Sequence, residues 1–317
     1  MERRHSTVGV AGAGLMGIGI ATRFAAAGHR AILYDASPEQ LDRVLQHVEA
    51  IVGELLASGS ISAEQARAVP NRVSLCHVVH ELHEASIVFE AIKEDVQLKR
   101  HCYAELETVL SEGAIIASNT SGFLPDALSA EMRNPERFAI AHFWNPPHVI
   151  SLVEIVPGTR TSGQTTRALA ESLGSIGMEP VVLERAIPGF IGNRLQFAVL
   201  REALHIVRAG VAEPAVVDTV MQACLGRRYR LFGPFESADI GGLDTLLGIA
   251  KYLMPALAKD EGVLALMQAR VDGGDTGIAS GRGFYEWTES RKADVRERRL
   301  QSLCSHDAGR STDANQE

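Results

Sequence analysis

Short apolar runs alternate with longer amphipathic stretches along the first 187 residues of the chain. Runs of about four to eight residues that are rich in Val and Ile and end at turn residues are typical of strands buried on both faces. These runs cover 7–14, 30–35, 85–92, 113–119, 137–143, 151–156 and 179–184. Helical patterns lie after the first run and from Pro38 onward, and this alternation predicts an α/β domain with a mostly parallel sheet.

The pattern changes at Ile187, after which no run is convincing as a strand. Residues 188–209 form a helical pattern that has a proline in its first turn and Gly210 just past its end. Residues 214–225 predict a second helix, which Gly226 is expected to end. An all-α segment therefore follows the sheet.

This change of pattern predicts a domain boundary near residue 187. We expect a sheet domain over 1–187 and an all-α C-terminal domain over 188–317. A charged helical pattern covers 290–303, and a polar tail follows it. Because the tail has almost nothing apolar to bury, we expect disorder from about residue 303.

A glycine-rich turn directly follows the first predicted strand. Gly12, Gly14 and Gly17 form GxGxxG before a helix, and Leu15 and Met16 lie in the same turn. The first glycine permits the tight turn, the second lets the backbone approach a pyrophosphate, and the third lets helix and strand pack closely. The helix N-terminus then offers free N–H groups to the phosphates. These residues predict the cofactor site of a Rossmann-type domain; glycines that serve packing alone are the alternative.

An aspartate ends the second predicted strand. Asp35 lies 18 residues beyond Gly17, close to the offset of about 20 residues at which an acidic side chain meets the adenosine ribose hydroxyls. A 2′-phosphate would be repelled by Asp35, and Ala36, Ser37 and Pro38 supply no cation. The predicted cofactor is therefore NAD rather than NADP.

Composition argues against several classes of function. The net charge of −8 and pI near 5.8 disfavour a nucleic-acid partner, because phosphate binding draws on clustered Lys and Arg. The four cysteines lack the spacing of a zinc site, so a reducing compartment is expected. We find no secretory signal and no apolar run of the roughly 20 residues that span a bilayer. The expectation is a cytoplasmic protein with a small-molecule substrate and no membrane partner.

One cysteine and three histidines fall within a short segment that could suggest a metal site. They are Cys76, His77, His80 and His83. On a helix, His77 and His83 would point to different faces while the apolar residues form a buried stripe. That stripe would be Val78, Val79 and Leu82. The segment is therefore predicted to be a solvated helix face without a metal.

Candidate chemistry gathers where predicted strands end. Residues 119–122 follow one strand, at the sheet end where open α/β proteins bind ligands, and the next strand carries His142. Glu154 lies in an otherwise apolar strand, where a carboxylate is costly unless it is paired. An imidazole twelve residues earlier is a suitable partner. The alternative is that Glu154 faces water on an edge strand.

Seven motifs together resemble the 3-hydroxyacyl-CoA dehydrogenase family over residues 6 to about 287. They are GAGLMGIGIA, FEAIKED, SNTSG, AHFWNPPHVISLVEIV, PGFIGNRL, GPFESADIGGLD and SGRGFYEW. The resemblance implies that His142 is the general base and that Glu154 orients it. It also implies that Ser121 and Asn193 contact the substrate oxygen.

Three further residues are assigned to the cofactor on the same resemblance. Glu90 is expected near the nicotinamide side of NAD, and Asn119 and Asn145 complete the predicted cofactor-binding set. The role of His142 agrees with the chemistry of the reaction, because removing a hydroxyl proton needs a group that titrates near neutrality, as imidazole does. Hydrogen bonds to the reacting oxygen would stabilise the transition state.

The substrate is less sharply predicted. The leading prediction is NAD-dependent oxidation of an L-3-hydroxyacyl-CoA, such as 3-hydroxybutyryl-CoA, to the 3-oxoacyl-CoA. Residues 53–75 contain no lysine, however, whereas relatives that hold the CoA phosphates tend to be lysine-rich there. Other stretches resemble the L-gulonate dehydrogenase (lambda-crystallin) and L-carnitine dehydrogenase branch, and HFWNPPH is similar to a pyridine-carboxylate dehydrogenase. A dehydrogenase of a free 3-hydroxy acid and a non-catalytic NAD-binding or structural protein are the alternatives.

Two features of the helical half bear on partners. Arg227, Arg228 and Arg230 could pair with a free carboxylate, or they could simply be solvated. The first long predicted helix has more apolar positions than packing against one other helix would bury. These positions are Leu195, Val199, Leu204 and Val207. The helical domain of the resembled family also usually forms a dimer. A homodimer is therefore expected.

Overall fold

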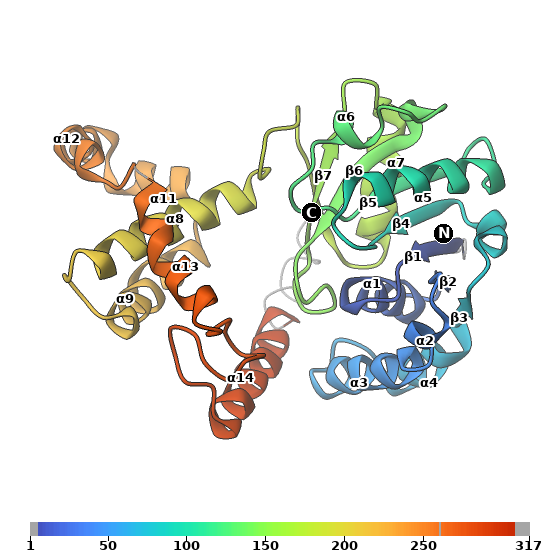
Figure 1. Ribbon diagram of the computed structural model, residues 1–317, viewed down its shortest axis with the longest axis horizontal. Coiled ribbons are helices and arrows are strands. Elements are labelled where there is room, and N and C mark those ends of the chain that lie inside the picture. Colours follow the sequence, from blue (N-terminus) through green and yellow to red (C-terminus); the bar gives the residue numbers. More distant parts are fainter. Residues whose placement is uncertain (1–5, 260, 308–317) are drawn as a thin grey trace, which may run out of the picture. The chain divides into compact units, whose positions relative to one another are not determined.

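The computed structural model describes residues 6–259 and 261–307. The chain forms two compact units (Figure 1). The first holds the chain as far as Phe190 together with the segment that begins at Val295, and the second is Ile191–Asp294. All the named strands lie in the first unit, and helices make up the named elements of the second.

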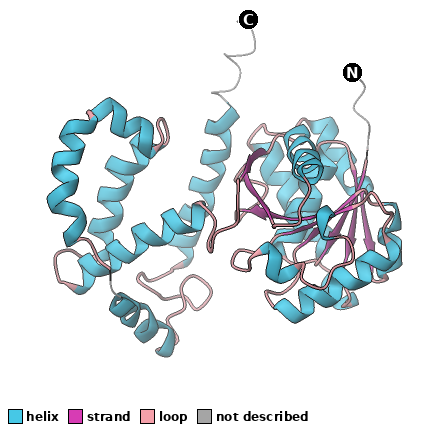
Figure 2. Cartoon of the chain, turned by 90° about the horizontal axis from the view of Figure 1, so that it is seen from above, coloured by secondary structure: helices cyan, strands magenta, loops and turns pink. Residues whose placement is uncertain are grey.

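The first unit is built on an eight-stranded sheet, drawn in magenta in Figure 2. Its strands are β1 (Thr7–Ala11), β2 (Arg30–Tyr34), β3 (Val73–Cys76), β4 (Ile87–Glu90), β5 (Ile115–Ser118), β6 (Phe138–Phe143), β7 (Leu152–Pro157) and β8 (Glu179–Val182). Their spatial order is β3-β2-β1-β4-β5-β6-β7-β8. Every neighbouring pair is parallel except β6 and β7, which are antiparallel. The predicted mostly parallel, Rossmann-type sheet is confirmed.

Helices cover both faces of this sheet. They are α1 (Leu15–Ala26), α2 (Pro38–Leu41), α3 (Val44–Ala57), α4 (Ala63–Arg72), α5 (Val96–Val109), α6 (Pro125–Leu128) and α7 (Gly163–Ser175), with the 3-10 helices η1 (Val79–Glu84) and η2 (Pro135–Arg137). Side chains of α1, α3, α4 and α7 join one apolar cluster, and those of α5, α6 and η1 join another. The sheet is therefore the middle layer of three.

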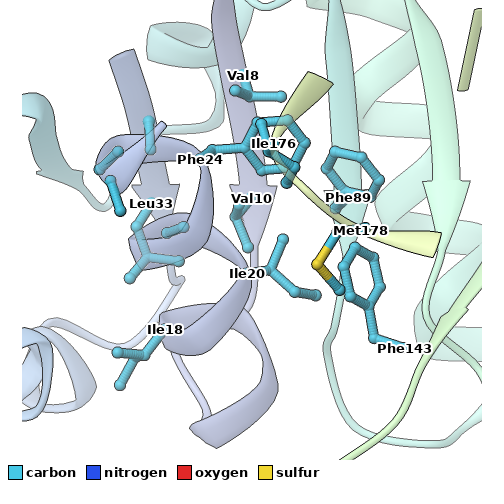
Figure 3. Close-up of a cluster of buried hydrophobic side chains, with 14 of the residues drawn as sticks. Val8, Val10, Ile18, Ile20, Phe24, Leu33, Phe89, Phe143, Ile176 and Met178 are labelled. Carbon is cyan, nitrogen blue, oxygen red and sulfur yellow. The ribbon is translucent and has the colours of Figure 1, made fainter. Parts of the chain in front are cut away.

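The apolar strands are continuous because both of their faces are covered. In β4, Ile87 and Phe89 belong to one cluster and Val88 belongs to the other. Figure 3 shows the first cluster, in which the ring of Phe89 lies 5.2 Å from that of Phe24 and 5.6 Å from that of Phe143. These contacts join α1 to the strands β4 and β6, the second of which carries His142.

β3 was not predicted from the sequence, and the segment after it differs from the helix that was expected. β3 begins at Val73, directly after α4 ends at Arg72, so no turn signal separates them. Cys76 is buried at the end of β3 rather than on a helix. The segment after it forms the short 3-10 helix η1 in place of the expected α-helix. Leu82 is buried as expected, but Val78 is 46% exposed, so its place in a buried stripe was wrong.

The second unit is helical and its helix limits differ from the predicted ones. Its elements are α8 (Gly192–Arg208), α9 (Pro214–Val220), the π-helical turn η3 (Met221–Leu225), α10 (Gly226–Tyr229), α11 (Pro234–Gly241), α12 (Leu243–Leu253), η4 (Met254–Ala256), η5 (Glu261–Val263), α13 (Leu264–Asp272) and the start of α14 (Glu289–Asp307). The expectation that Gly226 ends a helix was wrong, because its φ of −59° is helical and the chain continues into α10.

The ends of α8 and α14 also differ from expectation. α8 begins at Gly192 because Gly189 and Phe190 have φ of 78° and 52°, which are not right-handed helical values. α14 extends to Asp307, beyond the residue near which disorder was expected, and residues 308–317 lie outside the described part. Among residues 6–259 and 261–307, no helix is long and apolar enough to cross a membrane.

Candidate active site

The glycine turn between β1 and α1 is shaped by close backbone contacts. Gly12 has φ +108°, and a Cβ there would lie 2.7 Å from the carbonyl carbon of Ala91. A Cβ on Gly17 would lie 1.8 Å from the carbonyl oxygen of Gly12. In contrast, a Cβ on Gly14 would meet no heavy atom within 4 Å. The turn therefore leaves open space at Gly14, where the motif brings its backbone against a pyrophosphate.

Asp35 is held beside this turn. Its Oδ2 accepts a hydrogen bond of 2.8 Å from the N–H of Ala13, and its Oδ1 accepts one of 2.9 Å from the N–H of Ser37. The carboxylate thus has a defined position at the end of β2, as ribose binding requires. Leu15 is 69% exposed and Met16 is half-buried at the start of α1. The open turn and the fixed carboxylate fit a dinucleotide.

His142 and Glu154 form a buried pair across the antiparallel strands β6 and β7. The strand register places them directly opposite each other, and Nδ1 of His142 lies 3.0 Å from Oε2 of Glu154. Their side chains are 4% and 3% exposed. The alternative that Glu154 faces water on an edge strand is wrong, because β8 lies outside β7.

Ser121 lies on the other side of the imidazole. Its hydroxyl oxygen is 3.2 Å from Nε2 of His142, so hydroxyl, imidazole and carboxylate follow one another in a line. A neutral imidazole that donates Nδ1–H to Glu154 carries its lone pair on Nε2. Nε2 is then able to accept a proton from a hydroxyl at the end of the sheet where Ser121 lies.

Two aromatic rings flank His142. The ring of Phe190 lies 5.4 Å from the imidazole at an angle of 62°, and the ring of Trp144 lies 5.2 Å from it. Phe190 is fully buried although its φ of 52° is unfavourable for a side chain of this size. Phe190 was not among the predicted site residues, since nothing in the local sequence signals a positive φ at a phenylalanine. These rings restrict the imidazole and exclude water from it.

The two asparagines of the predicted cofactor set have different surroundings. Oδ1 of Asn119 accepts a 2.9 Å hydrogen bond from the N–H of Phe143, which joins the ends of β5 and β6. Asn145 is exposed in the turn after β6. Pro147 of the same turn packs on α1, because a Cβ on Gly19 would lie 2.5 Å from its Cγ.

Glu90, which is predicted to lie near the nicotinamide side of NAD, ends β4 and is enclosed by groups of the first unit. Its side chain is fully buried. Oε1 accepts hydrogen bonds from the ammonium group of Lys99 (2.6 Å) and the N–H of Ile92 (2.8 Å), and Oε2 accepts them from Tyr103 (2.6 Å) and Ser118 (2.8 Å). Burial and the Glu90 carboxylate raise the pKa of Tyr103 well above its usual value. These donors hold the Glu90 carboxylate in place, and its position near the nicotinamide remains a prediction.

The remaining predicted residues lie in the second unit. Asn193 is in the first turn of α8, and its contact with substrate remains a prediction. The three arginines considered as carboxylate partners are exposed and lie in or just after α10. Within the described part of the chain, no group of three or more His, Cys, Asp or Glu side chains could hold a metal ion.

The carboxyl ends of β1, β4, β5 and β6 meet at one edge of the sheet, since these strands are parallel. The glycine turn follows β1, Ser121 follows β5, and His142 lies near the end of β6. A dinucleotide bound at the turn can therefore extend along this edge toward the imidazole.

Comparison with known proteins agrees with this geometry. The profile of the 3-hydroxyacyl-CoA dehydrogenase NAD binding domain matches residues 7–186, and that of the C-terminal domain of the same family matches residues 189–287. A probable 3-hydroxybutyryl-CoA dehydrogenase of Bacillus subtilis (strain 168) is 35% identical over 88% of this chain and 96% of its own length. Lambda-crystallin of Oryctolagus cuniculus is 34% identical over 73% of each chain.

A relative with a different substrate is also similar along nearly the whole chain. The 5-formyl-3-hydroxy-2-methylpyridine 4-carboxylate 5-dehydrogenase of Mesorhizobium japonicum is 29% identical over 94% of this chain and 96% of its own length. The crystal structure of an NAD+-dependent enzyme of that activity has a TM-score of 0.88 over 96% of this chain and 97% of its own, at 28% identity. The two matching profiles and these relatives show that the chain belongs to the 3-hydroxyacyl-CoA dehydrogenase family, and that it is an NAD-dependent dehydrogenase.

Proposed function

We propose that the protein oxidises the 3-hydroxyl group of an L-3-hydroxyacyl compound to a ketone, with His142 as the general base. The observation that carries this proposal is the line of Ser121, His142 and Glu154 at the sheet edge that also carries the glycine turn. The substrate that we propose first is an L-3-hydroxyacyl-CoA, because both family profiles and the Bacillus subtilis relative support it.

Each residue of the line has one task. Nε2 of His142 takes the hydroxyl proton of the substrate, while bound NAD supplies the acceptor for the hydride that leaves the same carbon. Glu154 holds Nδ1–H and stabilises the imidazolium that forms, and burial strengthens this interaction. In this proposal Ser121 donates a hydrogen bond to the reacting oxygen, and Asn193 is expected to give a second.

The test is a rate comparison in which NADH formation is followed by absorbance. 3-Hydroxybutyryl-CoA, L-gulonate and L-carnitine would be compared for the wild type and for His142→Gln. We expect turnover of at least one compound by the wild type, and a loss of most of kcat with unchanged NAD affinity in the variant. Near-normal turnover in His142→Gln would refute the assignment. NAD binding without turnover of any hydroxy compound would favour a binding or structural role.

A second candidate is a dehydrogenase of a substrate without CoA. It is supported by the helical hairpin of α3 and α4, which contains no lysine and carries Glu49, Glu54 and Glu64 against Arg67 and Arg72. The carboxylates outnumber the arginines, so the hairpin offers the phosphates of CoA no net positive charge. The pyridine-carboxylate relative, whose name describes a free acid, matches nearly the whole chain. Faster turnover of free acids than of 3-hydroxybutyryl-CoA would select this candidate.

We also propose that the second unit forms a homodimer. Among the described residues of this unit, only Leu204, Ala258, Val263 and Gly283 are buried. Large apolar side chains are instead exposed, among them Leu195 (56%), Val199 (45%), Leu231 (72%), Phe235 (88%) and Leu243 (61%). A unit that buries so little cannot stabilise itself, and an apolar surface of this extent is typical of a subunit interface.

Light scattering coupled to size-exclusion chromatography tests the dimer. We expect the wild type to have twice the mass of one chain, and the double variant Leu231→Glu, Phe235→Glu to have the mass of one chain. A wild-type protein that remains monomeric at about 100 μM, a hundred-fold above a Kd of about 1 μM, would contradict this proposal.

A further inference from the structure

A hydrogen-bonded turn holds Ser121 in place. The hydroxyl of Thr120 is buried and accepts hydrogen bonds from the N–H groups of Gly122 (3.3 Å) and Phe123 (3.2 Å). The backbone therefore forms a tight turn that includes Ser121, which lies in the chain between the acceptor Thr120 and the donors Gly122 and Phe123. The same hydroxyl donates a hydrogen bond to Oε1 of Glu94. The conformation of the turn thus depends on a carboxylate from another loop.

Glu94 is itself fixed by a buried ammonium group. Nζ of Lys99 lies 3.2 Å from Oε2 of Glu94 and 2.6 Å from Oε1 of Glu90. The Lys99 side chain is only 1% exposed, and that of Glu90 is fully buried. A buried ammonium group needs charged or polar partners to offset the loss of its hydration. The two glutamates supply them, so Lys99 holds Glu94 on the rigid base formed by β4 and α5.

We propose that Glu94 and Thr120 are positioning residues that keep the Ser121 hydroxyl against Nε2 of His142. A chain of two hydrogen bonds and an ion pair leads from Glu90 through Lys99 and Glu94 to Thr120, and the turn at Thr120 presents Ser121 at 3.2 Å from the imidazole. Glu94 is the member of this chain that is open to solvent, with a side chain 46% exposed. The effect of this chain of contacts on kcat, the kinetic part of the inference, rests on the proposed function. The position of the Ser121 hydroxyl, its geometric part, does not.

The geometric part is tested by 15N NMR of the imidazole without substrate or cofactor. The His142 signals would be assigned by their loss in His142→Asn, and the Nε2 shift would be compared with that of Ser121→Ala. We expect Thr120→Val and Glu94→Ala to move the Nε2 signal in the same direction as Ser121→Ala, and Thr120→Ser to leave it unchanged. An Nε2 signal in Thr120→Val that matches the wild type would overturn the proposal.

Glu131→Gln is the matched control for charge. Glu131 pairs with Arg100 at 2.8 Å, its side chain is 70% exposed, and it does not belong to the Thr120 turn. We expect wild-type NMR shifts and kinetics in this variant. If Glu94→Ala does not fold, Thr120→Val still decides, because it removes the turn hydroxyl and leaves the Lys99 partners in place.

A double-mutant cycle tests the kinetic part on whichever compound the wild type oxidises. We expect Thr120→Val to lower kcat by about ten-fold with little change in the Kd of NAD, and to have almost no further effect in a Ser121→Ala background. Independent, multiplying effects of the two changes would show that Thr120 does not act through Ser121. A wild type that oxidises none of the compounds would defeat the proposed function alone, since the NMR result is independent of turnover.

Discussion

Replacing Glu154 by glutamine tests the pairing on which the mechanism depends. The change keeps the size of the side chain but removes its charge at a position where both partners are nearly inaccessible, at 4% and 3%. The glutamine can present either its oxygen or its NH2 group to Nδ1 of His142. In the second orientation the proton must move to Nε2, and the imidazole then cannot accept the substrate proton.

The distance between the two groups sets the expected size of the effect. Nδ1 and Oε2 are 3.0 Å apart, and a hydrogen bond between charged groups contributes about 1.5–3 kcal/mol. At about 1.4 kcal/mol for each factor of ten, this loss lowers kcat by roughly 10- to 150-fold. The wrong tautomer would add to this loss, so we expect a decrease of about 100-fold or more.

The assay separates this effect from a general loss of structure. kcat for the best substrate would be measured by NADH absorbance, the Kd of NAD by tryptophan fluorescence, and Tm by calorimetry. We expect the Kd of NAD to stay within about two-fold of the wild type, because Asp35 and the glycine turn do not contact Glu154. A kcat for Glu154→Gln within about three-fold of the wild type would refute the reasoning, as would an equal loss in Glu131→Gln.

Three further predictions concern the cofactor turn and the thiols. Gly14→Ala should keep the wild-type Tm but weaken NAD binding, because its Cβ would meet no protein atom within 4 Å. Gly17→Ala should lower the Tm, because its Cβ would lie 1.8 Å from a backbone oxygen. Calorimetry and titration with NAD would compare the two variants. Asp35→Asn should weaken NAD binding by about ten-fold, since a charged hydrogen-bond acceptor to ribose is lost, as titration would show. Burial raises the pKa of Cys102 to about 12. A thiol reagent at pH 8 should therefore label Cys102 far more slowly than the exposed Cys224, and the labelling of Cys102 should accelerate as the pH rises. Mass spectrometry of the labelled protein would locate the label.

Much of the sheet and half of the site could be predicted because their signals are local. A strand buried on both faces must be apolar throughout, so a single carboxylate such as Glu154 stands out within β7. The glycine turn is equally readable, because only glycine tolerates φ +108° at Gly12 and the close approach at Gly17. In each case one residue type is required by geometry within a few positions of the chain.

The remaining features depend on contacts between distant segments. Lys99 lies on an amphipathic helix, where a lysine normally faces solvent, and only its approach to Glu90 and Glu94 explains its burial. Likewise Glu90 carries a charge that suggests a ligand contact, yet its neighbours Tyr103 and Ser118 come from other elements and enclose it. No pattern along the sequence reports that the charges of Lys99 and Glu90 are buried while that of Glu94 is partly exposed.

The register between β6 and β7 shows how packing and chemistry select the same arrangement. His142 is opposite Glu154, while Val153 and Ile155 point to the other face and join the apolar cluster. Because successive side chains alternate between faces, a slip by one residue would turn Glu154 into that cluster and place an apolar side chain opposite the imidazole. An unpaired carboxylate there would cost several kcal/mol, and the packing of Val153 and Ile155 in the cluster would be disrupted as well. The burial that stabilises the two strands therefore also excludes the register in which the base would lose its partner.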